Sequence, residues 1–341
     1  MPTLPSTLPS FLQLPGTDDK PRPFFNLGSS CFINASLTAL FGLEPFRHVL
    51  SHLLQNDEPR LRTNLWATAV SISGSHKEPR VLPAITHEER LAVTYAASLR
   101  APTETDNIPR GRAIIPYLFT HRFYHRNQED AHEFLQTIMN ETNAPRLHRA
   151  CQGLDTPTLR CREANCGTER AAAEEWFNWL SLPLVHDGQL HRTVQEALDA
   201  YLQPELLDDD DFPFRCANPT CQSTRLPYKT SHLTVLPAVL CVQLKRWRTN
   251  RDEDALLHDV QCDEHLRCQG TLYVRRSVIC HMGNTPQAGH YTCRIHYPCA
   301  SGTWWYYNNS ERRAATPTEL LTTTPVRGNT ERTYLAFYER Q

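Results

Sequence analysis

The sequence lacks the features that would point to a membrane, a nucleic acid or the cell exterior. Its formal net charge is −2 at pH 7, and this balance argues against a surface that binds nucleic acid. No apolar run approaches the roughly 18 residues that a membrane-spanning helix needs. Residues Met1 to Gly16 have neither the basic start nor the continuous apolar core of a signal peptide. We therefore expect no membrane and no nucleic-acid partner.

Lysine is scarce, whereas cysteine and proline are plentiful. Only Lys20, Lys77, Lys229 and Lys245 are lysines among the 35 Lys and Arg residues, an imbalance that a general bias toward arginine, alanine and proline explains. The 12 cysteines are too dilute in 341 residues for a secreted disulfide scaffold. We expect a reducing compartment, the cytoplasm or the nucleus or both. At 40% apolar residues, the chain can bury the core of one large domain with subdomains or of two ordinary ones.

Helical patterns dominate the first half of the chain. Residues 1–23 are rich in proline and predict a disordered leader, so the folded part should begin near Phe24. Helices are predicted over residues 31–41, 44–55, 88–100 with a Thr86–Glu89 capping box, 128–141 with Asn127 as N-cap, and 194–202 with a Thr193–Glu196 capping box. The first of these is predicted to be amphipathic and to be closed by Gly42.

Strand patterns dominate after residue 233. Five runs rich in β-branched and aromatic residues are separated by turn-forming residues, as in an antiparallel sheet: LTVLPAVLCVQLKRW, TLYVRRSVICHM, HYTCRIHY, TWWYYN and TYLAFYER. Helices first and strands last predict an α+β architecture.

Cys31 stands at the start of the first predicted helix. Unpaired N–H groups and the positive end of the helix dipole favour a thiolate there and can bind an oxyanion. Asn26 offers a further amide donor for a tetrahedral intermediate. The alternative is a buried, inert cysteine, which is the more common state of a free thiol. The surrounding residues favour a nucleophile.

A thiolate nucleophile needs a base, and histidine titrates in the right range. Of the 16 histidines, His290 follows Gly289 and opens a predicted strand, where Gly289 leaves backbone clearance for a substrate. His281, on the preceding strand, is the alternative. Asn308 and Asn309 end the next strand, and if the two strands form a hairpin, Asn308 can orient the imidazole of His290. Otherwise the two asparagines are simply turn residues.

A second group of residues has the spacing of metal ligands. Cys161 and Cys166 form one pair, and Cys216 and Cys221 form another with the same four-residue spacer. Four thiolates hold Zn²⁺ tetrahedrally with no open position, so such a metal would be structural. The alternatives are a site that has lost its metal and four unconnected thiols.

Six motifs in the same order resemble the ubiquitin-specific proteases, a family of papain-like cysteine peptidases. They cover about residues 24–340: NLGSSCFINASLTALF, QEDAHEFL, LPAVLCVQLKRW, YVRRSVICHMG, GHYTCRIHY with WWYYNNS, and TYLAFYER. The chain departs from the family at Asn309, where an acid is common, at Trp247, where Phe is common, and in the wider spacer of each cysteine pair.

The resemblance implies a fold of three subdomains. These are a helical thumb at about residues 24–150, zinc-ribbon-like fingers at about 151–232, and an antiparallel β palm at about 233–341. It also implies a role for each matching residue. Cys31 would be the nucleophile, His290 the base, Asn308 the orienting residue and Asn26 the oxyanion donor, while Asp130 would help to hold the C-terminal tail of the modifier. Gly289, from its backbone clearance next to His290, is the other residue expected to bind the substrate.

The activity so implied is hydrolysis of the isopeptide bond at the C-terminal glycine of ubiquitin, with ubiquitin and ubiquitinated proteins as partners. Zn²⁺ would be held in the fingers and would take no part in the chemistry. Two alternatives remain open, a catalytically weak ubiquitin-binding scaffold and a protease for another ubiquitin-like modifier. The oligomeric state does not follow from the sequence.

Overall fold

The computed structural model describes most of the chain in segments. The described residues are 21, 23–24, 26, 29–55, 86–99, 128–186, 188–207, 214–247, 256–297, 303–316, 319–320, 325–326 and 329–341. Most of the predicted leader and the predicted N-cap Asn127 lie outside them. Pro21 is described, and its carbonyl accepts hydrogen bonds from the Tyr307 hydroxyl at 2.7 Å and from Arg312 Nη1 at 3.1 Å.

The described helices agree with most of the predicted ones. They are α1 (Cys31–Phe41), α2 (Glu44–Gln55), α4 (His87–Leu99), α6 (Ala131–Ile138), α7 (Pro145–Cys151) and α8 (Val194–Tyr201). The capping box of α4 is confirmed by reciprocal hydrogen bonds between Thr86 and Glu89, and that of α8 by the matching pair Thr193 and Glu196. Among the described residues, no helix has both the length and the apolar character that crossing a membrane requires.

Two predicted helices differ from the structure. The helix predicted over residues 128–141 is shorter, because Asp130, not Asn127, is its N-cap and accepts from His132 N at 2.7 Å. The first helix was predicted to be amphipathic, but all residues of α1 are buried, including Asn34, Ser36 and Thr38. The prediction was wrong because α1 is central and contacts both the helices α2 and α6 and strands of the large sheet.

Gly42 ends α1 for a different reason from the one predicted. Its φ is −71°, so its backbone lies in the right-handed helical region, which any residue can adopt. A Cβ here would lie 3.0 Å from Cβ of Ile295, so close packing against the sheet favours glycine.

The strands form one large sheet and several small ones. Their bounds are β1 (Gly153–Asp155), β2 (Thr158–Arg160), β3 (Glu169–Ala171), β4 (Glu175–Phe177), β5 (Leu180–Pro183), β6 (Val185–His186), β7 (Gln189–Leu190), β8 (Glu205–Leu206), β9 (Tyr228–Thr230), β10 (Leu233–Val235), β11 (Val239–Lys245), β12 (His265–Cys268), β13 (Thr271–Thr285), β14 (Ala288–His296), β15 (Trp304–Asn308), β16 (Glu311–Ala314), β17 (Pro325–Val326), β18 (Asn329–Thr330) and β19 (Arg332–Arg340).

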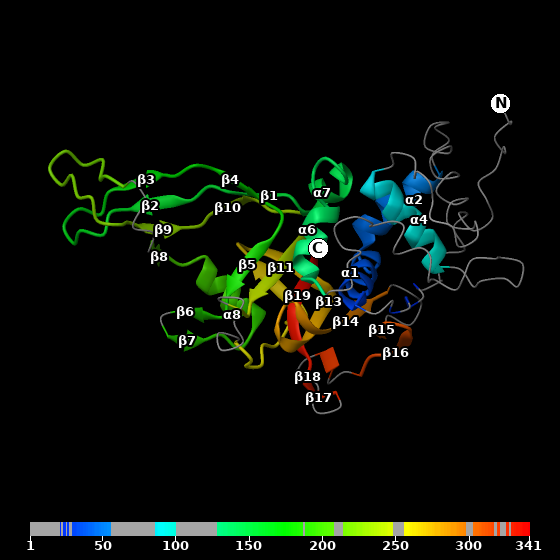
Figure 1. Cartoon of the computed structure of the whole chain (residues 1–341). Coiled ribbons are helices and arrows are strands. Elements are labelled where there is room, and N and C mark those ends of the chain that lie inside the picture. The colour runs from blue at the N-terminus through cyan, green and yellow to red at the C-terminus, as the bar shows by residue number, and fades with distance from the viewer. Residues whose placement is uncertain are drawn as a thin grey trace, which may run out of the picture.

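The large sheet has the order β16-β15-β14-β13-β19-β11-β5, with β12 paired to β13. All its pairs are antiparallel except that of β5, which runs parallel to β11. One face of this sheet packs on α1 and its neighbouring helices, and the other face packs on α8 (Figure 1). Pro237 separates β10 from β11, which the sequence predicted as one run.

Two small sheets formed by strands between α7 and β11 extend away from the large sheet, whereas β5 and α8 of the same segment stay with it. Strands β10-β1-β4 form one small sheet and β3-β2-β9-β8 form another, which carries the loops with the paired cysteines (Figure 1). The predicted hairpin of β14 and β15 is confirmed, with Cys293 opposite Tyr307 and Arg294 opposite Tyr306.

Candidate active site

Cys31 is the first residue of α1 and is 1% exposed. The chain before it is held by Asn26, whose Oδ1 accepts from Ser30 N at 3.2 Å and from Ser30 Oγ at 3.3 Å. These contacts identify Oδ1 as the acceptor of the Asn26 amide, and Nδ2 is therefore its donor. Cys31 thus lies where the helix directs its first backbone N–H groups.

His290 and Asn308 lie together beside Cys31. His290 Nε2 is 2.7 Å from Asn308 Oδ1, an acceptor, so Nε2 carries the proton and Nδ1 is the ring nitrogen available to the thiol. The pKa of His290 is raised, chiefly by hydrogen bonding with the Cys31 thiol; burial opposes this, and Asn308 and Glu331 contribute further increases. The structure therefore brings three predicted site residues together.

His281, the alternative base, is placed differently. Its side chain is 2% exposed and packs between the rings of Trp247 and Tyr291, with centroids at 5.4 Å and 4.5 Å. Burial lowers its pKa to about 3, so the ring is neutral at ordinary pH. A buried neutral ring at the floor of the site is poorly suited to carry protons to and from a substrate.

Gln128 is a site residue that the sequence reasoning missed. Its Oε1 accepts from Gly289 N at 2.6 Å, its Nε2 donates to the Gly289 carbonyl, and Nε2 also lies 3.7 Å from Cys31 Sγ. Gln128 therefore holds the residue before His290 and places an amide donor beside the thiol. The signal was present, since Gln128 opens the motif QEDAHEFL, but only Asp130 was taken from it.

Gly289 has φ +146°, and a Cβ here would lie 2.1 Å from the Met282 carbonyl oxygen and 2.7 Å from His281 Nε2. Glycine is thus required by the packing of the protein itself. The clearance that the sequence predicted for a substrate on this side is taken up by β13, and a substrate-binding role of Gly289 stays a prediction.

Asp130 lies between α6 and the large sheet. Besides capping α6, its two carboxylate oxygens each accept from the Tyr334 hydroxyl at 2.9 Å, and burial raises its pKa. Tyr334 also lines a groove of about 500 Å³, whose other walls include Gln243, Trp247 and Leu184. One of its walls, Trp247, packs on His281 of β13, the strand paired with the one that carries His290, with ring centroids 5.4 Å apart. Binding of a substrate tail by Asp130 stays a prediction.

Asn309, where the family commonly has an acid, has a structural role. It has φ +49°, in the left-handed region that asparagine tolerates, and lies in the turn between β15 and β16. Its Oδ1 accepts from Asn34 Nδ2 at 3.0 Å, one turn after Cys31 on α1. Asn309 thus ties the turn that carries Asn308 to the helix that carries Cys31.

The four predicted metal ligands gather at the tip of the extended segment. Atoms of Cys161, Cys166, Cys216 and Cys221 all lie within 4.8 Å of one another. The Sγ atoms of Cys161 and Cys221 are 3.9 Å apart, and those of Cys166 and Cys216 are 3.5 Å apart. Tetrahedral Zn²⁺ with four thiolates at about 2.3 Å requires sulfur separations of about 3.8 Å, so the cluster fits that ion.

The neighbours of this cluster also suit thiolates. Asn218 directs its backbone N–H to Cys216 Sγ at 3.5 Å and its side-chain amide to Cys166 Sγ at 3.6 Å. Hydrogen bonds from Thr168 lower the pKa of Cys166 to about 6, whereas the pKa values of Cys161 and Cys221 are raised by burial and by neighbouring cysteines. Donors aimed at sulfur are the outer contacts that stabilise a metal-bound thiolate.

Comparison with known proteins identifies the family. A family model for ubiquitin carboxyl-terminal hydrolases matches residues 24–338, so the chain belongs to this family, and its resemblance to the ubiquitin-specific proteases is confirmed. Ubiquitin carboxyl-terminal hydrolase 25 of Arabidopsis thaliana is 23% identical over 98% of this chain and 50% of its own length. Ubiquitin carboxyl-terminal hydrolase 12 of Salmo salar is 23% identical over 78% of this chain and 75% of its own. The chain spans half the length of the Arabidopsis relative.

Solved structures show the same fold. A SAGA DUB module with Ubp8, bound to monoubiquitin, superposes with a TM-score of 0.68 at 22% identity, covering 95% of this chain and 70% of that one. The same module bound to ubiquitin aldehyde gives a TM-score of 0.67 at 21% identity, again over 95% and 70%. The predicted α+β, papain-like fold is thereby confirmed.

Proposed function

We propose that this chain is a thiol-dependent deubiquitinase that hydrolyses the isopeptide bond between the C-terminal glycine of ubiquitin and a lysine amine. The observation that carries the proposal is the convergence of Cys31, His290 and Asn308 at the start of α1 in a member of this family. Binding of ubiquitin alone does not require a histidine that is oriented by Asn308 and hydrogen-bonded with the Cys31 thiol. This arrangement therefore favours an enzyme over a binding scaffold.

The first half of the reaction forms a thioester. His290 Nδ1 takes the thiol proton, and the Cys31 sulfur attacks the glycine carbonyl carbon to form a C–S bond. The carbonyl electrons move to oxygen. When they return, the C–N bond breaks, and the proton on His290 passes to the lysine amine as it leaves. In the second half, His290 takes a proton from water, hydroxide adds to the thioester, and the thiolate departs and regains the proton. No metal takes part.

Three donors from the region around Cys31 support a site for the oxyanion in this proposal. The backbone N–H of Cys31 opens α1, Asn26 presents its Nδ2 end, and Gln128 has Nε2 within 3.7 Å of the sulfur. Loss of one such donor typically lowers the rate about 100-fold. The neutral Asn308 fixes the tautomer of His290 by accepting from Nε2, so that Nδ1 faces the thiol as an acceptor.

The groove beside Tyr334 is the route we propose for the C-terminal tail of ubiquitin. It lies between β11 and the Pro183–Val185 segment, and Tyr334 connects it to the buried carboxylate of Asp130. A solved relative of the same fold is bound to monoubiquitin, which supports ubiquitin as the partner. The cysteine cluster is proposed to hold one structural Zn²⁺, as its sulfur separations and its N–H donors support.

Hydrolysis of a fluorogenic amide of ubiquitin tests the proposal. The purified chain should release the fluorophore, Asn26→Ala should be about 100-fold slower while remaining folded, and Cys31→Ala should be inactive. A matched amide of another ubiquitin-like modifier distinguishes the two kinds of protease. Turnover of neither substrate by a folded protein would remove the enzyme and leave the binding scaffold.

A further inference from the structure

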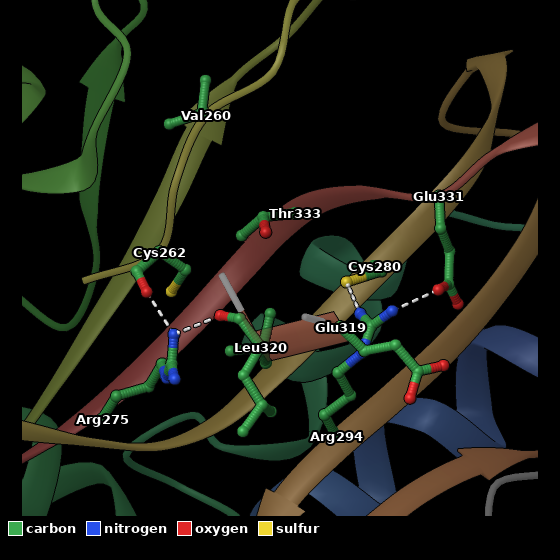
Figure 2. Close-up of a pocket in the computed structure, with 10 residues that line it drawn as sticks. Val260, Cys262, Arg275, Cys280, Arg294, Glu319, Leu320, Glu331 and Thr333 are labelled. Carbon is green, nitrogen blue, oxygen red and sulfur yellow. Dashed lines mark hydrogen bonds and ion pairs between the residues drawn. The ribbon is translucent and has the colours of Figure 1, made fainter. Parts of the chain in front are cut away.

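A polar cluster on the large sheet, next to the His290–Asn308 pair, has no part in the scheme above. Its side chains line a small enclosed space, and Figure 2 shows Arg294 between Cys280 and Glu331, with Glu319 nearby. The space measures about 10 Å³, which has room for at most a single water molecule. The space is therefore too small for a ligand, and any function of this cluster must come from the charged side chains that line it.

The cluster shares a sheet face with the catalytic histidine. His290, Thr292 and Arg294 alternate along β14, so their side chains project from the same face. Arg294 lies opposite Tyr306 of β15, which puts Asn308, two residues further along, on this face as well. The observed contact of Asn308 with His290 agrees with this placement.

Glu331, just before β19, directs its carboxylate into this row. The side chain is 1% exposed and accepts from the Thr292 hydroxyl, from Arg294 Nη2, and from the Tyr306 hydroxyl at 3.4 Å. Thr292 is two residues from His290, whereas Arg294 is four residues away. The negative end of the buried ion pair is thus the end nearer to His290.

Charge near His290 matters because the imidazole must become positive during the reaction. A neighbouring carboxylate stabilises such an imidazolium, but Asn308 and Asn309 are both neutral. The titratable groups that act on His290 come from several elements: Cys31 on α1, His281 on β13 and Glu331 before β19. His281 is neutral, so Glu331 supplies a negative charge besides the one that forms on Cys31.

We propose that Glu331 is a positioning residue that stabilises the protonated form of His290 across the shared sheet face, in place of an acid at position 309. Thr292 and Arg294 hold the carboxylate, and Glu331 itself does not touch the substrate. The proposal rests on the proposed function for its role in turnover.

The test compares Glu331→Gln with a matched control, Glu339→Gln. Glu339 is also a buried carboxylate of the C-terminal strand region and pairs with Arg276 at 2.8 Å, but it lies opposite Val274, at the far end of β19 from His290. The protonation of His290 is followed by NMR with isotope-labelled histidine, with the resonance assigned from its loss in His290→Gln. Hydrolysis of the ubiquitin amide is measured across the same pH range.

In Glu331→Gln, His290 should titrate at lower pH than in the wild type. The acid limb of the pH profile of kcat/KM should also move to lower pH. Glu339→Gln should leave both where the wild type has them. If Glu331→Gln does not fold, Glu331→Gln with Arg294→Met removes both charges and should still lower the His290 midpoint, by less. An unchanged midpoint in the folded variant overturns the proposal. The NMR titration needs no turnover, so an inactive wild type would overturn the proposed function and leave this test intact.

Discussion

Replacing Asn308 with alanine tests how the neutral amide supports His290. The substitution removes the acceptor that lies 2.7 Å from His290 Nε2. A hydrogen bond to a charged group contributes about 1.5–3 kcal/mol, and the imidazole is charged in the transition state. At about 1.4 kcal/mol for each factor of ten, kcat/KM should fall about 10- to 150-fold. The acid limb of the pH profile should also move to lower pH, because Asn308 contributes to the raised pKa of His290.

The assay is hydrolysis of the fluorogenic ubiquitin amide from acid to alkaline pH, with circular dichroism to verify folding. Asn309→Gly is the matched control, since it removes the acceptor for Asn34 but permits the positive φ of the turn. We expect a loss of only a few-fold for this control. A folded Asn308→Ala variant that keeps kcat/KM within about twofold of the wild type, with the acid limb of its pH profile unmoved, would contradict this role of Asn308.

Three further predictions follow from other parts of the structure. Gln128→Ala should lower kcat by about 10- to 100-fold, because it removes the hydrogen bonds that hold Gly289 next to His290, while the melting temperature stays near that of the wild type; equal kcat values would contradict this. Gly289→Ala should lower the free energy of unfolding, measured in urea, by at least about 1–3 kcal/mol, because its Cβ would lie 2.1 Å from the Met282 carbonyl oxygen. An unchanged urea midpoint would contradict the close packing at Gly289. Metal analysis in reducing buffer should find about one equivalent of zinc, and a chelator should lower the melting temperature; a metal-free protein would exclude the proposed site.

Local signals in the sequence predicted much of the candidate site. Cys31 was predicted at a helix start, and the hairpin that brings Asn308 to His290 followed from two strand patterns and a short connection. The four cysteines were predicted to form one cluster across 49 intervening residues because their spacers match, and the structure brings them together. These features depend on neighbours in the chain or on a repeated spacing.

Features that depend on tertiary packing could not be predicted from local sequence patterns. The complete burial of α1 was missed because Asn34, Ser36 and Thr38 look polar in sequence. The Thr38 hydroxyl donates to the Asn34 carbonyl within the helix at 2.8 Å, so Thr38 can be buried without a polar partner outside the helix. The pattern of polar and apolar residues therefore does not reveal that it is buried. The parallel pairing of β5 with β11 joins segments about 60 residues apart, and no local pattern encodes such a partner.

Gln128 and Glu331 illustrate the same limit at the site. Each hydrogen-bonds the segment that opens at Gly289, which is 161 residues after Gln128 and 42 residues before Glu331 in the chain. A residue type alone does not reveal that an amide will clamp a distant backbone or that a buried carboxylate will lie near a histidine. Only the folded arrangement of β14, β19 and the start of α6 shows both.

The most direct measurement is the reaction of the purified chain with ubiquitin that bears a C-terminal thiol-reactive electrophile. We expect one covalent adduct per chain, mapped to Cys31 by mass spectrometry and absent from Cys31→Ala. A folded wild-type protein that forms no adduct, or forms it at another cysteine, would contradict the claim that Cys31 is the nucleophile of a deubiquitinase.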